Sequence, residues 1–211
     1  MGKERNMDKD FLLRTYGSLY GPEAGPWNLS AEQKYLEYRA TAFFEENFPV
    51  AEGEDICNVG IGAGYWDRYL SYRLQGGGLV SIDLDPQICR ALEEGLRNEG
   101  NPAPVRVICK DVMECEGLEG RFGIVTMTGS TRMESGLFES ILEKLFTFLK
   151  PGGSLFYQSL DPREEAAAVE ALCQGQGFRV EKYLLDTRYG RKAQYWKITA
   201  CGLAFQRPQQ A

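Results

Sequence analysis

Short apolar runs alternate, from residue 50 onward, with segments whose apolar side chains recur at helical spacing. Each run is short enough for a buried strand, and each intervening segment is long enough for a helix. The strand-like runs cover residues 55–59, 79–82, 105–109, 122–128 and 154–158, and the helical segments cover residues 65–74, 86–99 and 137–149. This alternation is typical of a parallel sheet covered by helices.

The end of the chain breaks the alternation. Residues 178–185 and 193–200 are two strand-like runs rich in Tyr, Val, Ile and Trp, and a short turn joins them. Two such runs in succession predict an antiparallel hairpin. We therefore expect an α/β, Rossmann-like sheet of seven strands, mostly parallel with an antiparallel last strand.

Two capping boxes predict further helices. Ser30-Ala31-Glu32-Gln33 precedes a segment with Leu36, Ala40, Phe43 and Phe44 on one face, and Asp161 to Glu164 precedes a segment that reaches about residue 174. Glycines and prolines interrupt residues 1–29. We expect an N-terminal helical cap over residues 1–50, the α/β domain over residues 51–205 and a tail over residues 206–211.

Charge and hydropathy narrow the classes of partner. The 211 residues carry 24 Lys and Arg against 30 Asp and Glu, for a net charge of −6, which disfavours nucleic acid as a partner. No stretch reaches the ~18 apolar residues that span a bilayer, and the first ten residues do not resemble a signal peptide. These features predict a cytoplasmic protein without a membrane segment.

The absence of histidine limits the chemistry. No His occurs in the chain, which excludes Ser-His and Cys-His nucleophile systems and almost every zinc site, so we expect no metal. The six cysteines form no C-x-x-C pair, and buried reduced thiols are the simpler interpretation.

Three glycines stand between the first strand and the next helix. Gly60, Gly62 and Gly64 allow a polar ligand to approach the backbone and the helix N-terminus. Asp83 ends the following strand, where a carboxylate can accept hydrogen bonds from ribose hydroxyls. The residues predict an adenosine-containing cofactor, although a simple tight turn remains an alternative. The third glycine comes one residue too early for the dinucleotide pattern G-x-G-x-x-G.

At this point the chain resembles the class I S-adenosylmethionine-dependent methyltransferases over about residues 30–201. The resemblance rests on NVGIGAG at 58–64, VSIDLDP at 80–86, Asp111-Val112, FGIVTMT at 122–128 and FLKPGGSLFY at 148–157. It implies S-adenosyl-L-methionine as cofactor.

The resemblance also assigns residues to parts of that cofactor. It implies that Gly60, Gly62 and Gly64 border the methionine moiety and that Asp83 holds the ribose. It further implies that Leu84 packs on the adenine, that Asp111 and the Val112 amide meet the ring, and that Thr128 lies near the sulfonium. Two positions depart from the family pattern: Asn58 replaces the usual acid of the first motif, and Gly123 replaces an aspartate.

The methyl acceptor is less constrained. Thr128-Gly129-Ser130-Thr131 stands where amino-methylating relatives carry Asn or Asp-Pro-Pro-Tyr, so adenine-N6 and glutamine methylation are disfavoured. We expect in-line, metal-free transfer to a small molecule, which requires alignment and a dry site. Substrate candidates are Tyr16, Tyr20, Trp27 and Arg132.

Three alternatives remain open. The chain could be a cofactor-binding module without transfer activity, since Asn58 brings no charge to the methionine amino group. It could be an RNA methyltransferase that uses the basic residues Lys182, Arg188, Arg191 and Lys192 around the hairpin. A nicotinamide dehydrogenase is the third alternative.

Overall fold

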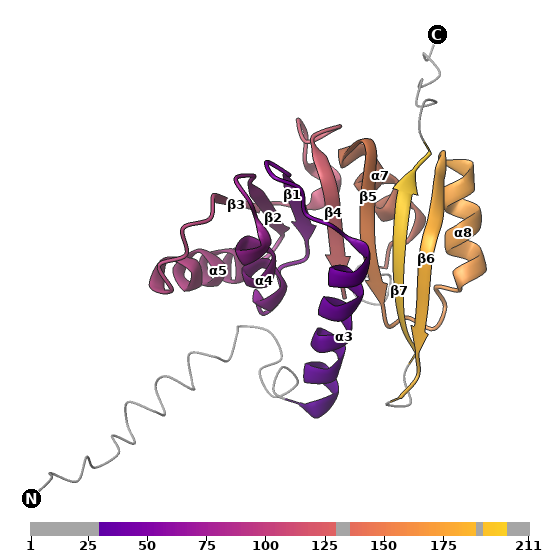
Figure 1. Cartoon of the computed structure of the whole chain (residues 1–211), viewed down its shortest axis with the longest axis horizontal. Coiled ribbons are helices and arrows are strands. Elements are labelled where there is room, and N and C mark those ends of the chain that lie inside the picture. The colour runs from indigo at the N-terminus through magenta and orange to yellow at the C-terminus, as the bar shows by residue number, and fades with distance from the viewer. Residues whose placement is uncertain (1–29, 130–135, 189–191, 202–211) are drawn as a thin grey trace, which may run out of the picture.

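Seven strands form one sheet in the order β3-β2-β1-β4-β5-β7-β6 (Figure 1). The computed structural model describes residues 30–129, 136–188 and 192–201. Strand β7 is antiparallel to both β5 and β6, and the β1–β2, β1–β4, β2–β3 and β4–β5 pairs are parallel. The predicted fold class is therefore confirmed. The strands are β1 (Ile56–Val59), β2 (Leu79–Asp83), β3 (Val105–Cys109), β4 (Phe122–Thr128), β5 (Leu149–Ser159), β6 (Phe178–Asp186) and β7 (Ala193–Ala200).

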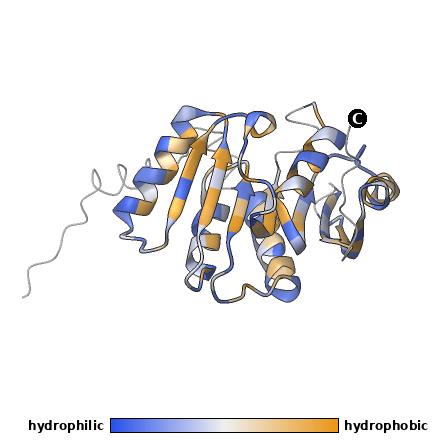
Figure 2. Ribbon diagram, turned by 90° about the horizontal axis from the view of Figure 1, so that it is seen from above, coloured by the Kyte–Doolittle hydropathy of each residue, from blue (hydrophilic) through white to orange (hydrophobic). Residues whose placement is uncertain are grey.

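Helices cover both faces of this sheet. Helices α3, α4 and α5 pack on one face, and α7 and α8 pack on the other (Figure 1). Their bounds are α3 (Ala31–Asn47), α4 (Tyr65–Arg73), α5 (Pro86–Asn98), α7 (Glu139–Phe148) and α8 (Ala166–Gly175), with a short 3₁₀ helix η1 (Val112–Glu114) after β3. The strands are largely apolar where the helices cover them (Figure 2).

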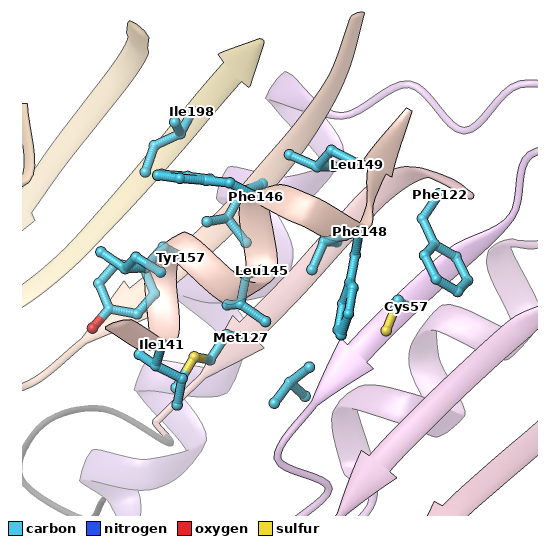
Figure 3. Close-up of a cluster of buried hydrophobic side chains, with 14 of the residues drawn as sticks. Cys57, Phe122, Met127, Ile141, Leu145, Phe146, Phe148, Leu149, Tyr157 and Ile198 are labelled. Atoms are coloured by element: carbon cyan, nitrogen blue, oxygen red, sulfur yellow. The ribbon is translucent and has the colours of Figure 1, made fainter. Parts of the chain in front are cut away.

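The two faces bury different kinds of core. The α7 face is mostly aliphatic, with Leu145 and Met127 fully buried among phenylalanines (Figure 3). The α3 face is richer in aromatic side chains: Phe44 stacks on Phe48 at 5.0 Å and meets Trp66 edge-on at 5.4 Å. Helix α3 therefore shares a core with the central strands.

Helix α3 begins where the sequence predicts. Ser30 Oγ accepts a hydrogen bond from the Gln33 amide at 3.0 Å, as an N-cap serine does. The Gln33 side-chain amide donates a hydrogen bond to Glu37 Oε1 at 3.4 Å. The four residues predicted to face inward are all buried: Leu36, Ala40, Phe43 and Phe44.

The predicted start of α8 is wrong. Asp161 and Glu164 form no capping box, and the helix begins later, at Ala166. The buried Asp161 carboxylate binds the Arg163 guanidinium at 2.6 Å, and the buried Glu164 accepts a hydrogen bond from the Tyr157 hydroxyl at 2.5 Å. Both acids are thus engaged elsewhere, Asp161 by a side chain two residues away and Glu164 by Tyr157 of β5.

The segment after α7 also differs from expectation. Residues 149–153 belong to β5, in which Leu149 pairs with Phe122 before the register shifts. The predicted division into a cap, a domain and a tail stays a prediction, because residues 1–29 and 202–211 lie outside the described part of the chain. All six cysteines are free thiols, and two of them, Cys109 and Cys201, are exposed where we expected burial.

Candidate functional site

The glycine loop connects β1 to α4 in a conformation that needs glycine. Gly60, Gly62 and Gly64 have φ values of 84°, 53° and 74°, in the left-handed region. A Cβ at Gly64 would lie 3.3 Å from Leu92 Cδ1. No side chain caps α4 at Gly64, so the amide groups of its first turn are available to a ligand.

Asp83 closes this loop as well as ending β2. Its Oδ2 accepts a hydrogen bond from the Ile61 amide at 2.8 Å, and its Oδ1 accepts one from the Asp85 amide at 2.9 Å. Each carboxylate oxygen has a second lone pair. The same carboxylate can therefore hold the loop and accept ribose hydroxyls.

Three further cofactor candidates follow β2 and β3. The Leu84 side chain is 73% exposed next to Asp83. Asp111 is exposed and caps η1, with its Oδ1 accepting the Met113 amide at 2.9 Å. Val112 buries its side chain in the core beside Asp111. The exposed Leu84 side chain offers an apolar surface and the exposed Asp111 carboxylate offers a polar group, and the two together suit a purine ring.

The strand order brings these groups into one row. Asp111, Asp83, the glycine loop and Thr128 follow β3, β2, β1 and β4, which are neighbours at the same edge of the sheet. With strands ~4.8 Å apart, the row extends about 14 Å. It suits an extended ligand with an adenine end and an amino-acid end.

Asn58 lies beneath the loop and is fully buried. Its amide nitrogen donates to the Gly60 carbonyl at 3.1 Å and to Asp67 Oδ1 at 2.9 Å, and its Oδ1 accepts from Thr126 Oγ1 at 2.8 Å. Both N–H groups are thus engaged within the protein. Asn58 acts on the loop through Gly60, and a direct contact with the cofactor stays a prediction.

Asp67 is the functional candidate that sequence reasoning missed. It lies in α4 and is fully buried. Burial raises the pKa of this carboxyl group to about 7, against hydrogen bonds that lower it. The sequence does contain a signal for it. Asp67 follows Trp66 and stands three residues before Leu70, which places an acid on the apolar face of the predicted helix.

The other departure from the family pattern, Gly123, lies at the opposite end of the sheet. A Cβ there would lie 2.0 Å from Glu54 Oε1, and Glu54 pairs with Lys150 at 2.6 Å. Gly123 therefore makes room for an ion pair and takes no part in the site.

The acceptor side of the site lies beyond Thr128. Thr128 pairs with Gln158 on β5, and Gln158 pairs with Tyr195 on β7, so the three side chains share the face that α3 covers. Helix α3 begins at this edge, where β4 and β5 end (Figure 1). The predicted substrate residues Tyr16, Tyr20, Trp27 and Arg132 all lie outside the described residues.

Comparison with known proteins finds a family match over the candidate cofactor site. A family described as a methyltransferase domain matches residues 56–153, the stretch that holds the glycine loop, Asp83, Asp111 and Thr128. The chain therefore carries the sequence pattern and the fold of an S-adenosylmethionine-dependent methyltransferase domain. Its cofactor is S-adenosylmethionine, and the bare glycine loop, the exposed Leu84 and the open lone pairs of Asp83 fit that molecule. No curated protein matches the chain in sequence.

Solved structures share the methyltransferase fold at low identity. A S-adenosylmethionine-dependent methyltransferase from Aquifex aeolicus is 17% identical, with a TM-score of 0.65 over 88% of this chain and 97% of that chain. The 1,6-didemethyltoxoflavin-N1-methyltransferase of Burkholderia thailandensis, bound to its substrate and S-adenosylhomocysteine, is 14% identical, with a TM-score of 0.64 over 95% and 93%. The [4+2]-cyclase SpnF is 12% identical, with a TM-score of 0.69 over 87% and 86%. These likenesses concern the fold alone.

Proposed function

We propose that this methyltransferase transfers the methyl group in line to a small-molecule acceptor, without a metal. The observation that carries the proposal is the set of three paired residues Thr128, Gln158 and Tyr195 on β4, β5 and β7. Gln158 is 7% exposed and Tyr195 is fully buried beneath α3, and the Tyr195 hydroxyl has no hydrogen-bond partner within the described residues. Thr128 is partly exposed beside these buried side chains, and a site bounded in this way suits a small acceptor better than a polymer.

Methyl transfer requires the protein mainly to position the cofactor and the acceptor. The sulfonium of S-adenosylmethionine supplies an activated methyl group, so no covalent enzyme intermediate is needed. The chain contributes alignment through the glycine loop and Asp83, and α3 packs on Tyr195, which keeps water from that side of the site. No group of three candidate metal ligands occurs among the residues that the structure describes.

The charges around the terminal hairpin favour a small acceptor over RNA. Arg179 and Lys197 both pair with Glu181, at 2.8 and 3.1 Å, and Arg188 lies 3.9 Å from Asp186. Glu181 and Asp186 thus offset part of the positive charge of the hairpin. Together with the net charge of −6 over the whole sequence, this disfavours phosphate binding. No described helix is long and apolar enough to cross a bilayer.

The test follows a labelled methyl group. The protein is incubated with S-adenosylmethionine labelled in its methyl group and with a metabolite extract separated into low-mass molecules, RNA and protein. Parallel reactions contain a chelator. We expect label in a low-mass product and equal transfer with the chelator, because no step needs a metal.

Three results would contradict the proposal in different ways. Label in the RNA fraction would support the RNA alternative, and loss of transfer with the chelator would show a metal requirement. Binding of S-adenosylhomocysteine without transfer to any fraction would support a cofactor-binding module without transfer activity.

A further inference from the structure

A buried polar cluster lies between α4 and the centre of the sheet, directly under the glycine loop. Ser81, Asn58 and Thr126 pair across the neighbouring strands β2, β1 and β4, and all three are fully buried. Helix α4 adds the Trp66 indole, which donates to Thr126 Oγ1 at 3.1 Å, and Asp67. The cluster therefore connects the start of α4 to three strands.

Asp67 is the acidic member of this cluster. Its Oδ1 accepts the Asn58 amide at 2.9 Å, and the Ser81 hydroxyl and the Asp67 amide also act on the carboxylate and lower its pKa. Burial nevertheless raises the pKa to about 7, so these neutral donors do not make up for the lost solvation. A carboxylate buried in this way weakens the fold and calls for a functional explanation.

The connection from Asp67 to the loop is short. The Asn58 amide nitrogen bridges Asp67 Oδ1 at 2.9 Å and the Gly60 carbonyl at 3.1 Å. Charge on Asp67 therefore acts on the loop across one side chain, in surroundings that screen it poorly. A ligand with a positively charged group at Gly60 would experience that charge.

We propose that Asp67 is a positioning residue of the cofactor site, whose carboxylate supplies the negative charge that attracts the amino group of the ligand to the glycine loop. The inference rests on the proposed function, since it takes an S-adenosyl amino acid as the ligand. It assigns to α4 a charge that Asn58, at the end of β1, cannot supply.

The protonation state of Asp67 should then control binding near neutral pH. The ionisable groups that act on it from the packed strands are Asp83 on β2, which raises its pKa, and Cys57 on β1, whose own pKa is raised by burial. Arg68, the next residue of α4, pairs instead with Glu99. A cationic ligand favours ionised Asp67, so its affinity should increase as pH rises through the pKa of Asp67.

The test compares two ligands on the full chain by calorimetric titration. S-adenosylhomocysteine carries the amino group, and 5′-methylthioadenosine keeps the adenosine and the sulfur but lacks the amino-acid portion. Between about pH 6 and about pH 8.5, we expect the affinity of wild type for S-adenosylhomocysteine to rise about tenfold and that for methylthioadenosine to stay constant. Asp67→Asn should bind S-adenosylhomocysteine about tenfold more weakly at the higher pH, without pH dependence, and methylthioadenosine as wild type does.

Ser71→Ala is the matched control. Ser71 is buried on the same helix one turn further on, where its Oγ donates to the Arg68 carbonyl and accepts from Asn101, both at 2.7 Å, away from the loop. This variant should keep the pH dependence of wild type. Equal weakening of both ligands by Asp67→Asn would overturn the proposal, because it would show a purely structural role; so would unchanged affinity for S-adenosylhomocysteine. If wild type binds neither ligand, the proposed function itself fails.

Discussion

Asp83 shows how one residue serves both the fold and the cofactor. Its two oxygens accept hydrogen bonds from the amides of Ile61 and Asp85, which fix the glycine loop against β2. The sequence predicts the ligand contact from the position of an acid at the end of a strand. It does not predict the contact to Ile61, because that depends on the path of the loop in three dimensions.

Replacing Asp83 should therefore affect binding and stability together. Asp83→Ala removes hydrogen bonds to a charged acceptor that contribute about 1.5 to 3 kcal/mol each, so affinity for S-adenosylhomocysteine should fall at least tenfold. The Ile61 and Asp85 amides lose their acceptor, which should lower the free energy of unfolding by about 1 to 3 kcal/mol. Calorimetric titration and urea denaturation measure the two effects. Unchanged affinity would show that the residue assignments along β2 are wrong.

The Asn58–Asp67 pair marks the limit of sequence reasoning at this scale. A departure from the family pattern at Asn58 is visible in the sequence, and so is an acid in an apolar helix. Their contact at 2.9 Å is not, because nothing in the spacing says which strand residues α4 covers. The glycine positions, in contrast, follow directly from local backbone geometry.

At the scale of elements, local signals predict helices well where no buried partner competes. Ser30 and the inward face of α3 were predicted correctly because an N-cap and helical spacing are local properties. The start of α8 was predicted wrongly because Arg163 and Tyr157 bind the two acids of the expected capping box. The contact between Glu164 and Tyr157 forms only once β5 is in place, whereas the contact between Asp161 and Arg163 is local.

Helix α3 should contribute to stability as a core element. Phe44 is fully buried and contacts the rings of Phe48, Trp66 and Phe156. Phe44→Ala should cost about 3 to 5 kcal/mol of folding free energy, and each kcal/mol lowers Tm by about 2 to 4 °C for a protein of this size. Thermal denaturation measures the change. Tyr38→Ala, on the exposed side of the same helix, is the control, and equal losses for both variants would argue against the packing of α3.

For the molecule as a whole, the sequence contains no histidine that could titrate near neutral pH. Asp67 takes that place, because burial raises its pKa to about 7. Between about pH 4, near the pKa of Asp67 in the unfolded chain, and its folded pKa of about 7, Asp67 is protonated in the folded state and ionised in the unfolded state. The free energy of unfolding therefore falls as pH rises through this range.

Asp67→Asn should remove this contribution. We expect the variant to gain stability relative to wild type as pH rises from about 4 to about 7, reaching a Tm several degrees higher above pH 7 while cofactor binding weakens. Thermal melts of variant and wild type at a series of pH values measure the difference in Tm. Other acids contribute equally to both proteins, so their contributions cancel in this difference. A constant difference between variant and wild type across this range would mean that the pKa of Asp67 is not raised.

The most direct test of the account is a titration of the protein with S-adenosylhomocysteine and, separately, with NAD. The account predicts binding of S-adenosylhomocysteine with thermal stabilisation, about 2.7 kcal/mol when the ligand is present at 100 times its Kd. It predicts neither heat nor stabilisation with NAD, because the glycine spacing at Gly60, Gly62 and Gly64 differs from the dinucleotide pattern. Tighter binding of NAD than of S-adenosylhomocysteine would contradict it.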